Sequence, residues 1–265
     1  MRIVLLTSTH RRHKYIAGRL NASFDLAGII SEEKTQFSKD YSTLSSENQE
    51  FMLKHLRERE VSENQYFIDS DNFPAIKNFL FLPKGRINTP DVLTFLLDIN
   101  PTFIILFGTS IIKSPILDSF ANRIINIHLG LSPYYRGSGT NLWPLYFSEP
   151  ECVGATIHIA AKEVDAGAIL SQVRPDLIGT DSVHDVGNKV LVKVGEKLPV
   201  VLNDFFIGSK KPVLHTRSEG KLFRRTDLNA DILKRIYSNF ENGMIPDYIL
   251  KKDFRDLDRP IVGID

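Results

Sequence analysis

The feature that most constrains the fold is an apolar run at residues 102–107, which contains only one polar residue and directly follows Pro101. A strand with one face in water alternates apolar and polar residues, whereas a strand covered on both faces is apolar almost throughout. Residues 2–6 form a second run of this kind. Strands covered on both faces are typical of parallel sheets, whose strands are joined by helical crossovers. The sequence therefore predicts an α/β fold.

Short apolar runs alternate with amphipathic segments along the rest of the first two hundred residues. The expected strands are residues 26–30, 79–82, 124–128, 153–159 and 168–173. The expected helices are residues 14–20, a segment from 46 onward, and residues 89–97, 140–147 and 182–205. The connection at 160–167 is too short for a crossover, so its two strands should form an antiparallel hairpin. We predict a Rossmann-like, mixed but mostly parallel sheet flanked by helices, with a small C-terminal extension.

The extension begins where the strand and helix alternation ends, after residue 207. A polar break at 209–212 contains two lysines and a proline. Residues 213–216 and 221–224 are expected to pair as a small hairpin, and residues 229–240 to form an amphipathic helix. We therefore divide the chain into a core at 1–207 and an appendage at 208–265. The appendage is expected to supply part of a substrate surface or a homodimer contact.

A candidate catalytic site lies at the end of the run at 124–128. Asn126 and His128 are two residues apart, so on a strand they project from the same face. Asp165 follows on a loop that ends in Gly167. In acyl transfer to an amine, an asparagine amide can stabilise the oxyanion, a histidine can move the proton, and a carboxylate can hold the imidazole ring. Taken alone, the residues also fit packing and turn chemistry, and both interpretations stay open.

Three blocks in order give these residues a context. They are residues 126–137, which end in a Pro-x-x-Arg-Gly loop, residues 154–158 and residues 164–170. Together they resemble the folate-dependent formyltransferases, a family that includes glycinamide ribonucleotide, methionyl-tRNA and sugar-nucleotide N-formyltransferases. The resemblance implies that Asn126, His128 and Asp165 match the family's catalytic trio. It also implies that the formyl donor is N10-formyltetrahydrofolate.

The resemblance places the pterin ring of the donor beyond the carboxyl end of the strand at 102–107, where ligands of open α/β sheets bind. One wall of this pocket would be the turn at 107–112, and the other the loop at 160–165. The residues expected to line it are Phe107, Gly108, Thr109, Ile111, Ala161 and Val164. From the residues alone, Gly108 is equally compatible with a tight turn that binds nothing.

The acceptor is the part of the reaction that the sequence defines least. Arg136 and Gly137 follow His128 closely and are expected to contact the acceptor. Arg11 and Arg12 are a second pair of candidates for binding an anionic group of the acceptor. The first turn lacks the glycines with which glycinamide ribonucleotide enzymes bind phosphate, and the appendage is short for a tRNA-binding domain. We therefore expect a small amine, with a nucleotide-linked amino sugar of surface polysaccharide as the preferred acceptor.

Four other functions stay open. They are N-formylation of an amino acid or a siderophore precursor, a glycinamide ribonucleotide formyltransferase-like activity, folate binding without catalysis, and a nicotinamide-dependent oxidoreductase. The last lacks a Gly-x-Gly-x-x-Gly motif after the first strand. No metal site is expected, because no cysteine or carboxylate cluster accompanies His10 and His13. His158 alternates with apolar neighbours and is interpreted as structural.

Composition limits the partners and the cellular compartment that we expect for this protein. The formal net charge of +1 provides no global field for nucleic acid, so no nucleic-acid partner is expected. Cys152 is the only cysteine, which fits a reducing compartment. No apolar run reaches the length of about 18 residues needed for a membrane span. We therefore expect no membrane association and a cytoplasmic location.

Overall fold

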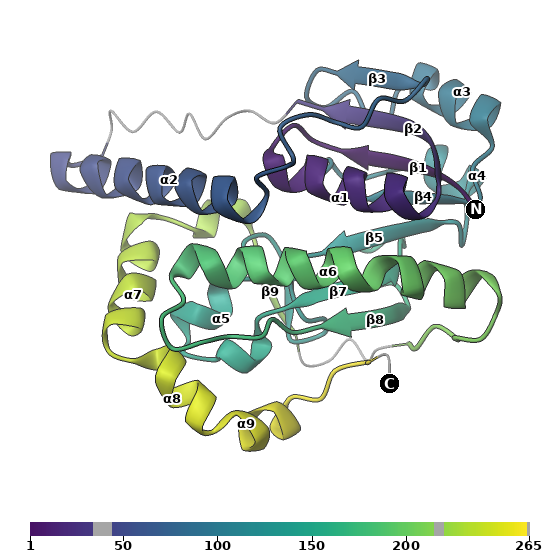
Figure 1. Ribbon diagram of the computed structural model, residues 1–265. Helices are drawn as coiled ribbons and strands as arrows, with labels where there is room; N and C mark the ends of the chain where they lie inside the picture. Colours follow the sequence, from purple (N-terminus) through teal and green to yellow (C-terminus); the bar gives the residue numbers. More distant parts are fainter. Residues whose placement is uncertain (34–43, 215–219, 264–265) are drawn as a thin grey trace.

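A computed structural model describes residues 1–33, 44–214 and 220–263. Its main sheet has seven strands in the order β3-β2-β1-β4-β5-β7-β8 (Figure 1). The strands are β1 (Arg2–Thr7), β2 (Asp25–Glu32), β3 (Phe79–Leu82), β4 (Phe103–Leu106), β5 (Ile124–His128), β7 (Ala155–Ile159) and β8 (Ile169–Val173). Pairing is parallel from β3 to β5 and antiparallel from β5 to β8. The mixed, mostly parallel sheet is confirmed.

Helices cover both faces of this sheet. The helices of the described residues are α1 (Arg11–Ser23), α2 (Ser46–Tyr66), α3 (Pro90–Ile99), α4 (Ile116–Ser119), α5 (Trp143–Tyr146), α6 (Val183–Phe206), α7 (Ala230–Glu241), α8 (Met244–Leu250) and α9 (Lys252–Asp258). Ile105 of β4 belongs to the apolar core beneath α1 and α6, whereas Ile104 and Leu106 belong to the core beneath α3 and α4. The strand is therefore buried on both sides, as its composition predicted.

Capping residues explain where two of the helices begin and end. Pro90 occupies the first turn of α3, and Asn100 ends this helix in the left-handed conformation with φ 45°. Ser182 accepts a hydrogen bond from the N–H of Asp185, whose side chain accepts one from the N–H of Ser182. This reciprocal capping box starts α6 at the residue expected from the sequence.

In the described ranges, no helix combines the length and apolar character needed to cross a membrane.

The segment after residue 207 differs from the prediction. Val213 pairs with Ile169, at the free edge of β8. The strand β9 (Lys221–Phe223) pairs in parallel with β6 (Tyr135–Gly137) in a second, two-stranded sheet. The predicted hairpin is therefore wrong, because each half finds an open edge elsewhere, and its residues 215–219 lie outside the described part of the chain.

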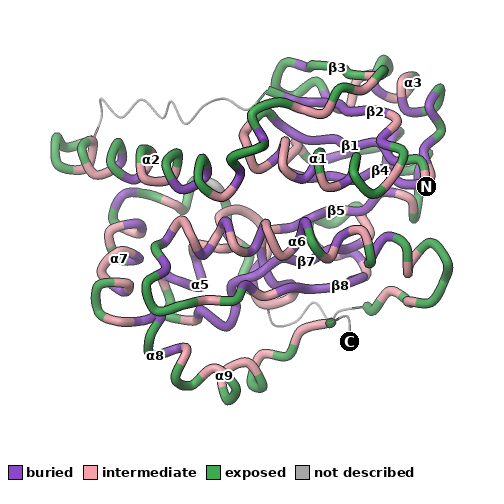
Figure 2. Tube along the Cα trace, viewed as in Figure 1, coloured by how far each residue is buried: buried purple, intermediate pink, exposed green. Residues whose placement is uncertain are grey.

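The helices of the appendage pack into the main core. Leu233 and Ile236 of α7, and Ile245 of α8, are buried in the same apolar cluster as the sheet and α6. Figure 2 shows the purple, buried side of α7 turned toward α5 and α6. The boundary at residue 207 stays a prediction, since the segments on its two sides share one core.

A hydrogen-bonded cluster joins α2, α6 and α7. The hydroxyl of Tyr237 donates to Glu58 (2.8 Å) and lies 3.1 Å from both His55 Nδ1 and His184 Nε2. Both ring nitrogens can donate to this oxygen while the rings are neutral. Burial lowers the pKa of His55 to about 3, with the charges of His184 and Arg59 adding to the effect. Burial and Arg59 lower the pKa of His184 to about 4.

These depressed pKa values predict that acid destabilises the fold. The unfolded chain takes up a proton on each ring near pH 6.5, whereas the folded chain resists it until pH 4 or below, so stability falls as pH drops through this window. The free energy of unfolding should fall by about 2 kcal/mol per ring between pH 6.5 and 5. Urea denaturation over this range measures it. The His55→Gln, His184→Gln double variant should show a shallower pH dependence, and an equally steep one would contradict the assignment.

Candidate active site

The candidate site lies on one face of the antiparallel half of the sheet. Cross-strand pairing sets Asn126 of β5 opposite His158 of β7, and His128 opposite Thr156. Thr156 in turn pairs with Gln172 of β8. Directly paired residues project from the same face. A row of polar side chains therefore crosses β5, β7 and β8, while the residues between them face the core beneath α6.

The structure brings together the three residues expected to carry the chemistry. Asp165 Oδ2 lies 3.3 Å from His128 Nδ1, and Asn126 Nδ2 donates to Asp165 Oδ1 at 3.4 Å. Since both β5 side chains contact one carboxylate, they do project from the same face, as the spacing of two indicated. The side chains of His128 and Asp165 are only 6% and 10% exposed, so their interaction is little screened by water.

The two ring nitrogens of His128 both face oxygen acceptors. Nδ1 faces Asp165, and Nε2 lies 3.2 Å from the carbonyl oxygen of Tyr135. Burial lowers the pKa of His128, while the carboxylate of Asp165 acts to raise it. A protonated ring can donate to both oxygens, but its burial disfavours the charge. The ring is therefore suited to take up a proton briefly and release it.

Asp165 is fixed by contacts on several sides. Its Oδ2 accepts a hydrogen bond from the N–H of Gly137 at 3.1 Å. Burial acts to raise the pKa of this carboxyl, but the interactions with His158, His128 and the N–H of Gly137 hold it below its usual value. Asp165 is therefore a carboxylate at neutral pH, ready to support a positive charge on His128.

His158 belongs to the site and is more than the structural residue expected from the sequence. Its Nδ1 donates to the carbonyl of Ile159 at 2.9 Å, so in the neutral ring Nε2 is the acceptor. Asn126 Nδ2 lies 3.0 Å from this Nε2. The ring thus orients the amide of Asn126. The signal in the sequence was the hairpin itself, since antiparallel pairing with β5 sets His158 opposite Asn126.

The turn expected to bind the donor is held by a carboxylate that sequence analysis missed. Glu32, at the end of β2, accepts from the N–H of Gly85 (2.8 Å) and from the N–H of Ser110 (2.9 Å). Within the turn, Phe107 is buried against the ring of His13, while Ile111 is 59% exposed.

The backbone of the predicted donor residues is arranged for a tight turn. Gly108 has φ 75°, a conformation that favours glycine, and the hydroxyl of Thr109 donates to the carbonyl of Ser110. On the opposite loop, Ala161 is exposed and Val164 is 40% exposed. Their contact with a folate stays a prediction.

The residues expected to contact the acceptor fall into two groups. Arg136 lies beside the site, where its Nη1 is 3.6 Å from Glu163 Oε1, and its buried Nε has no hydrogen-bond partner in the described part of the chain. Arg11 instead pairs with Asp71.

Arg12 also has a partner away from the trio. It donates to Glu63 of α2 at 2.6 Å, and burial lowers its pKa to about 10. Arg12 therefore helps to hold α2, and Arg11 holds the segment that follows it. Neither is part of the acceptor site proposed below.

Gly137 provides a test of the architecture. It has φ 93°, and a Cβ there would lie 2.2 Å from the carbonyl oxygen of Phe223. Gly137→Ala should therefore separate β6 from β9, move the N–H that holds Asp165, and lower stability by about 2 kcal/mol or more. Thermal unfolding measures this. Gly187→Ala in α6, where a Cβ meets nothing within 4 Å, is the control and should be neutral or stabilising. Equal effects of both substitutions would contradict this role.

Within the described ranges, no group of three or more His, Cys, Asp or Glu side chains is placed to hold a metal ion. The cluster is instead a set of hydrogen-bonding and proton-transfer groups at the end of the central strands. The fold and this cluster together define a formyltransferase-type α/β domain.

Comparison with known proteins supports the assignment to a formyltransferase-type domain. A sequence model described as formyl transferase matches residues 25–202, a span that includes the whole cluster. The chain belongs to the formyl transferase family.

Individual relatives are more distant. A methionyl-tRNA formyltransferase of Finegoldia magna is 28% identical over 124 residues, 46% of this chain and 39% of the relative. A phosphoribosylglycinamide formyltransferase of Escherichia coli is 30% identical over 112 residues, 42% of this chain and 52% of the relative. The matches thus span about half or less of these relatives. A solved sugar N-formyltransferase from Shewanella superimposes with a TM-score of 0.57 at 16% identity, covering 91% of this chain and 87% of that one.

Proposed function

We propose that this protein transfers a formyl group from N10-formyltetrahydrofolate to a primary amine. The observation that carries the proposal is the buried contact of Asp165 with both His128 and Asn126, inside the segment that matches the family. An amide donor, a proton carrier and a carboxylate at one point are the groups that acyl transfer to nitrogen requires.

The geometry supports the following division of roles. The acceptor nitrogen attacks the formyl carbon, and the electron pair of the carbonyl moves to its oxygen. The charge there is stabilised by the Asn126 N–H that makes only the long 3.4 Å contact with Asp165 in the free protein. The amine then loses a proton, and N10 gains one as its bond to carbon breaks. His128 carries this proton, with Asp165 stabilising the charged ring. The products are tetrahydrofolate and a formamide.

For the acceptor, we propose a nucleotide-linked amino sugar. The likeness in fold to the Shewanella sugar N-formyltransferase over 91% of this chain fits this choice, and so does the guanidinium of Arg136 beside the trio. An anionic diphosphate offers the oxygen atoms that a guanidinium binds in pairs. We also propose that the protein acts in the cytoplasm and forms a homodimer.

Arg136→Ala should raise the KM for the acceptor by tenfold or more while leaving the KM for the folate nearly unchanged. The reason is that its guanidinium contacts the bound anion and takes no part in the bond changes. Initial rates measured at varied concentrations of each substrate separate the two effects. Arg57→Ala on the exposed side of α2 is the matched control. A large loss of kcat at unchanged acceptor KM would remove Arg136 from the binding site.

The experiment that tests the function is an acceptor panel. Purified protein is mixed with N10-formyltetrahydrofolate and either a nucleotide-linked amino sugar, a free amino acid or glycinamide ribonucleotide, and the absorbance change of the folate is followed. Turnover with a nucleotide-linked sugar supports the full proposal. Turnover with free amino acids alone would contradict the proposed acceptor and leave formyl transfer standing.

A further inference from the structure

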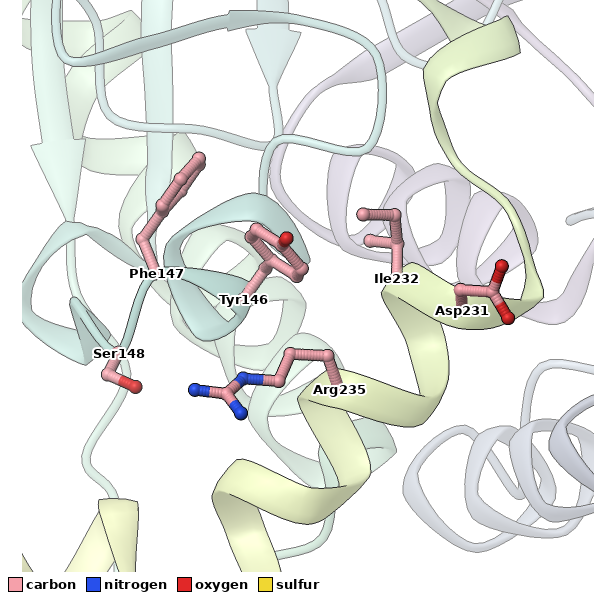
Figure 3. Close-up of a pocket in the computed structure, with 6 residues that line it drawn as sticks. All are labelled: Tyr146, Phe147, Ser148, Asp231, Ile232 and Arg235. Carbon is pink, nitrogen blue, oxygen red and sulfur yellow. The ribbon is translucent and has the colours of Figure 1, made fainter.

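Packed aromatic rings separate a hollow between α5 and α7 from the trio. Figure 3 shows this hollow, which is lined by Tyr146, Phe147, Ser148, Asp231, Ile232 and Arg235. The ring of Phe223 stacks on that of Tyr135 at 5.8 Å and on that of Trp143 at 4.4 Å, and these three rings pack between the hollow and the trio. The contact between the appendage and the back of the site is made elsewhere, by the segment that follows α9.

The segment after α9 lies along the outer edge of β8. In Figure 1 it runs from α9 back to this last strand of the main sheet. The N–H of Gln172 donates to the carbonyl of Val262 at 2.6 Å, and the N–H of Val262 donates to the side-chain oxygen of Gln172 at 2.9 Å. The hydroxyl of Tyr134 donates to the carbonyl of Pro260 at 2.9 Å. We call residues 260–263 the strap.

Gln172 connects the strap to the loop that follows β5. Its amide nitrogen donates to the carbonyl of Ser132 at 2.6 Å and to the hydroxyl of Thr156 at 3.0 Å. Turning the amide over would set its NH₂ group against the N–H of Val262 and its oxygen against the carbonyl of Ser132. The N–H of the strap therefore fixes the orientation of the Gln172 amide.

Thr156 and Ser132 extend this network along the loop. The hydroxyl of Thr156 donates to the carbonyl of Gly130 at 2.7 Å and accepts from the N–H of Ser132 at 3.0 Å. With the bond from Gln172, the one donor and both acceptor positions of this hydroxyl are used. The hydroxyl of Ser132 donates to the backbone carbonyl of Asp165 at 3.4 Å. Gln172, Thr156 and Ser132 are at most 4% exposed, so a partner lost here is not replaced by bulk water.

The loop held in this way carries two backbone groups that fix the trio. The carbonyl of Tyr135 lies 3.2 Å from His128 Nε2, and the N–H of Gly137 donates to Asp165 Oδ2 at 3.1 Å. Both groups follow Ser132 closely in the chain. A shift of the loop would therefore move the imidazole and the carboxylate, and a displacement of about 1 Å at reacting groups can lower a rate by about a hundredfold.

We propose that Gln172 is a positioning residue for formyl transfer, and that the strap holds its amide in the orientation that catalysis requires. Neither group touches the reacting atoms, and both act through the loop that holds His128 and Asp165. This inference rests on the proposed function, since it names residues that support the same site. It gives the C-terminal segment a part in catalysis.

Gln172→Glu tests the amide. The substitution keeps the shape of the side chain, but an ionised carboxylate has no proton to donate to the carbonyl of Ser132. A protonated carboxyl restores one donor, and burial favours that neutral form. The kcat relative to the parent should therefore be lowest at about pH 8.5, by roughly ten- to hundredfold, and should rise as pH falls toward about 6.5. Gln65→Glu, at an exposed position of α2, makes the same charge change elsewhere and should leave this ratio near one.

Val262→Pro tests the strap. The proline removes the N–H that holds the amide oxygen of Gln172, and kcat should fall by about tenfold. Val262→Ala is the conservative variant, which keeps this N–H and should recover most of the lost kcat. The KM for the folate should change by less than about threefold in Val262→Pro, because the turn at 107–112 lies outside the network. Initial rates and circular dichroism are measured on the same preparations.

An NMR measurement separates this inference from the proposed function. In protein labelled with ¹⁵N-histidine, the ring signals of His128 are identified by their loss in His128→Gln. They should shift in Gln172→Glu and in Val262→Pro, and stay in place in Gln65→Glu.

Each outcome decides one claim. Formyl transfer by the parent protein with an unchanged kcat in Gln172→Glu and Val262→Pro would overturn the positioning role alone. A loss of rate that only follows the fraction of unfolded protein would overturn it as well. Shifted ring signals in a protein that transfers no formyl group would support the positioning of His128 and contradict the function.

Discussion

Replacing His128 with alanine is expected to lower turnover by roughly 10²–10⁴-fold, the usual contribution of a proton-transferring group. Replacing Asn126 with alanine should lower it by roughly 10²–10³-fold, because the oxyanion then loses a fixed donor. In both variants the folate should still bind, since neither side chain is needed to hold the pterin ring. Initial rates and donor binding, measured on the same preparations, test this.

The matched control is Asn64→Ala, which removes an exposed amide on α2. It should leave turnover unchanged. Because His128 is buried, each variant also needs a thermal unfolding curve, which should show a cooperative transition. Near-normal turnover in a folded His128→Ala or Asn126→Ala variant would remove that residue from the mechanism.

Asp165→Asn should lower turnover strongly and also shift its pH dependence. The carboxylate acts to raise the pKa of His128 against the effect of burial, so its removal lets that pKa fall further. The limb of the pH–rate profile that reports His128 should therefore move to lower pH. The asparagine keeps the shape of the side chain, and a hydrogen bond from the N–H of Gly137 can persist.

Asp98→Asn, an exposed position on α3, makes the same change of charge away from the site and should leave the profile unchanged. A profile of Asp165→Asn that coincides with that of the parent protein would show that Asp165 does not support a charge on His128. His158 offers a further comparison, because it contacts the same carboxylate from β7.

The parts of the fold that follow from local pattern were predictable. The apolar run at β4 predicted a strand buried on both faces, and the short connection between β7 and β8 predicted the antiparallel hairpin that makes the sheet mixed. The spacing of Asn126 and His128 predicted that both side chains project from one face. Each of these features depends on neighbours in sequence, which is why periodicity and connection length were sufficient.

Features that depend on distant pairing were not predictable in the same way. The strand β9 lies against β6, more than eighty residues earlier, and no local signal distinguishes this partner from a hairpin. The role of Arg12 in holding α2 depends on a contact with Glu63 that only the folded chain creates. His158 lies between these cases, because strand register places it beside Asn126 once the hairpin is known.

The central claim is that the cluster of Asn126, His128 and Asp165 moves a formyl group onto an amine. The most direct measurement uses N10-formyltetrahydrofolate with a ¹³C-labelled formyl carbon and a nucleotide-linked amino sugar as acceptor, with the product followed by NMR and mass spectrometry. The account predicts a ¹³C-formamide on the acceptor nitrogen with the parent protein, and a strongly reduced rate of its formation with His128→Ala. A folded parent protein that transfers the label to no primary amine of the panel would contradict it.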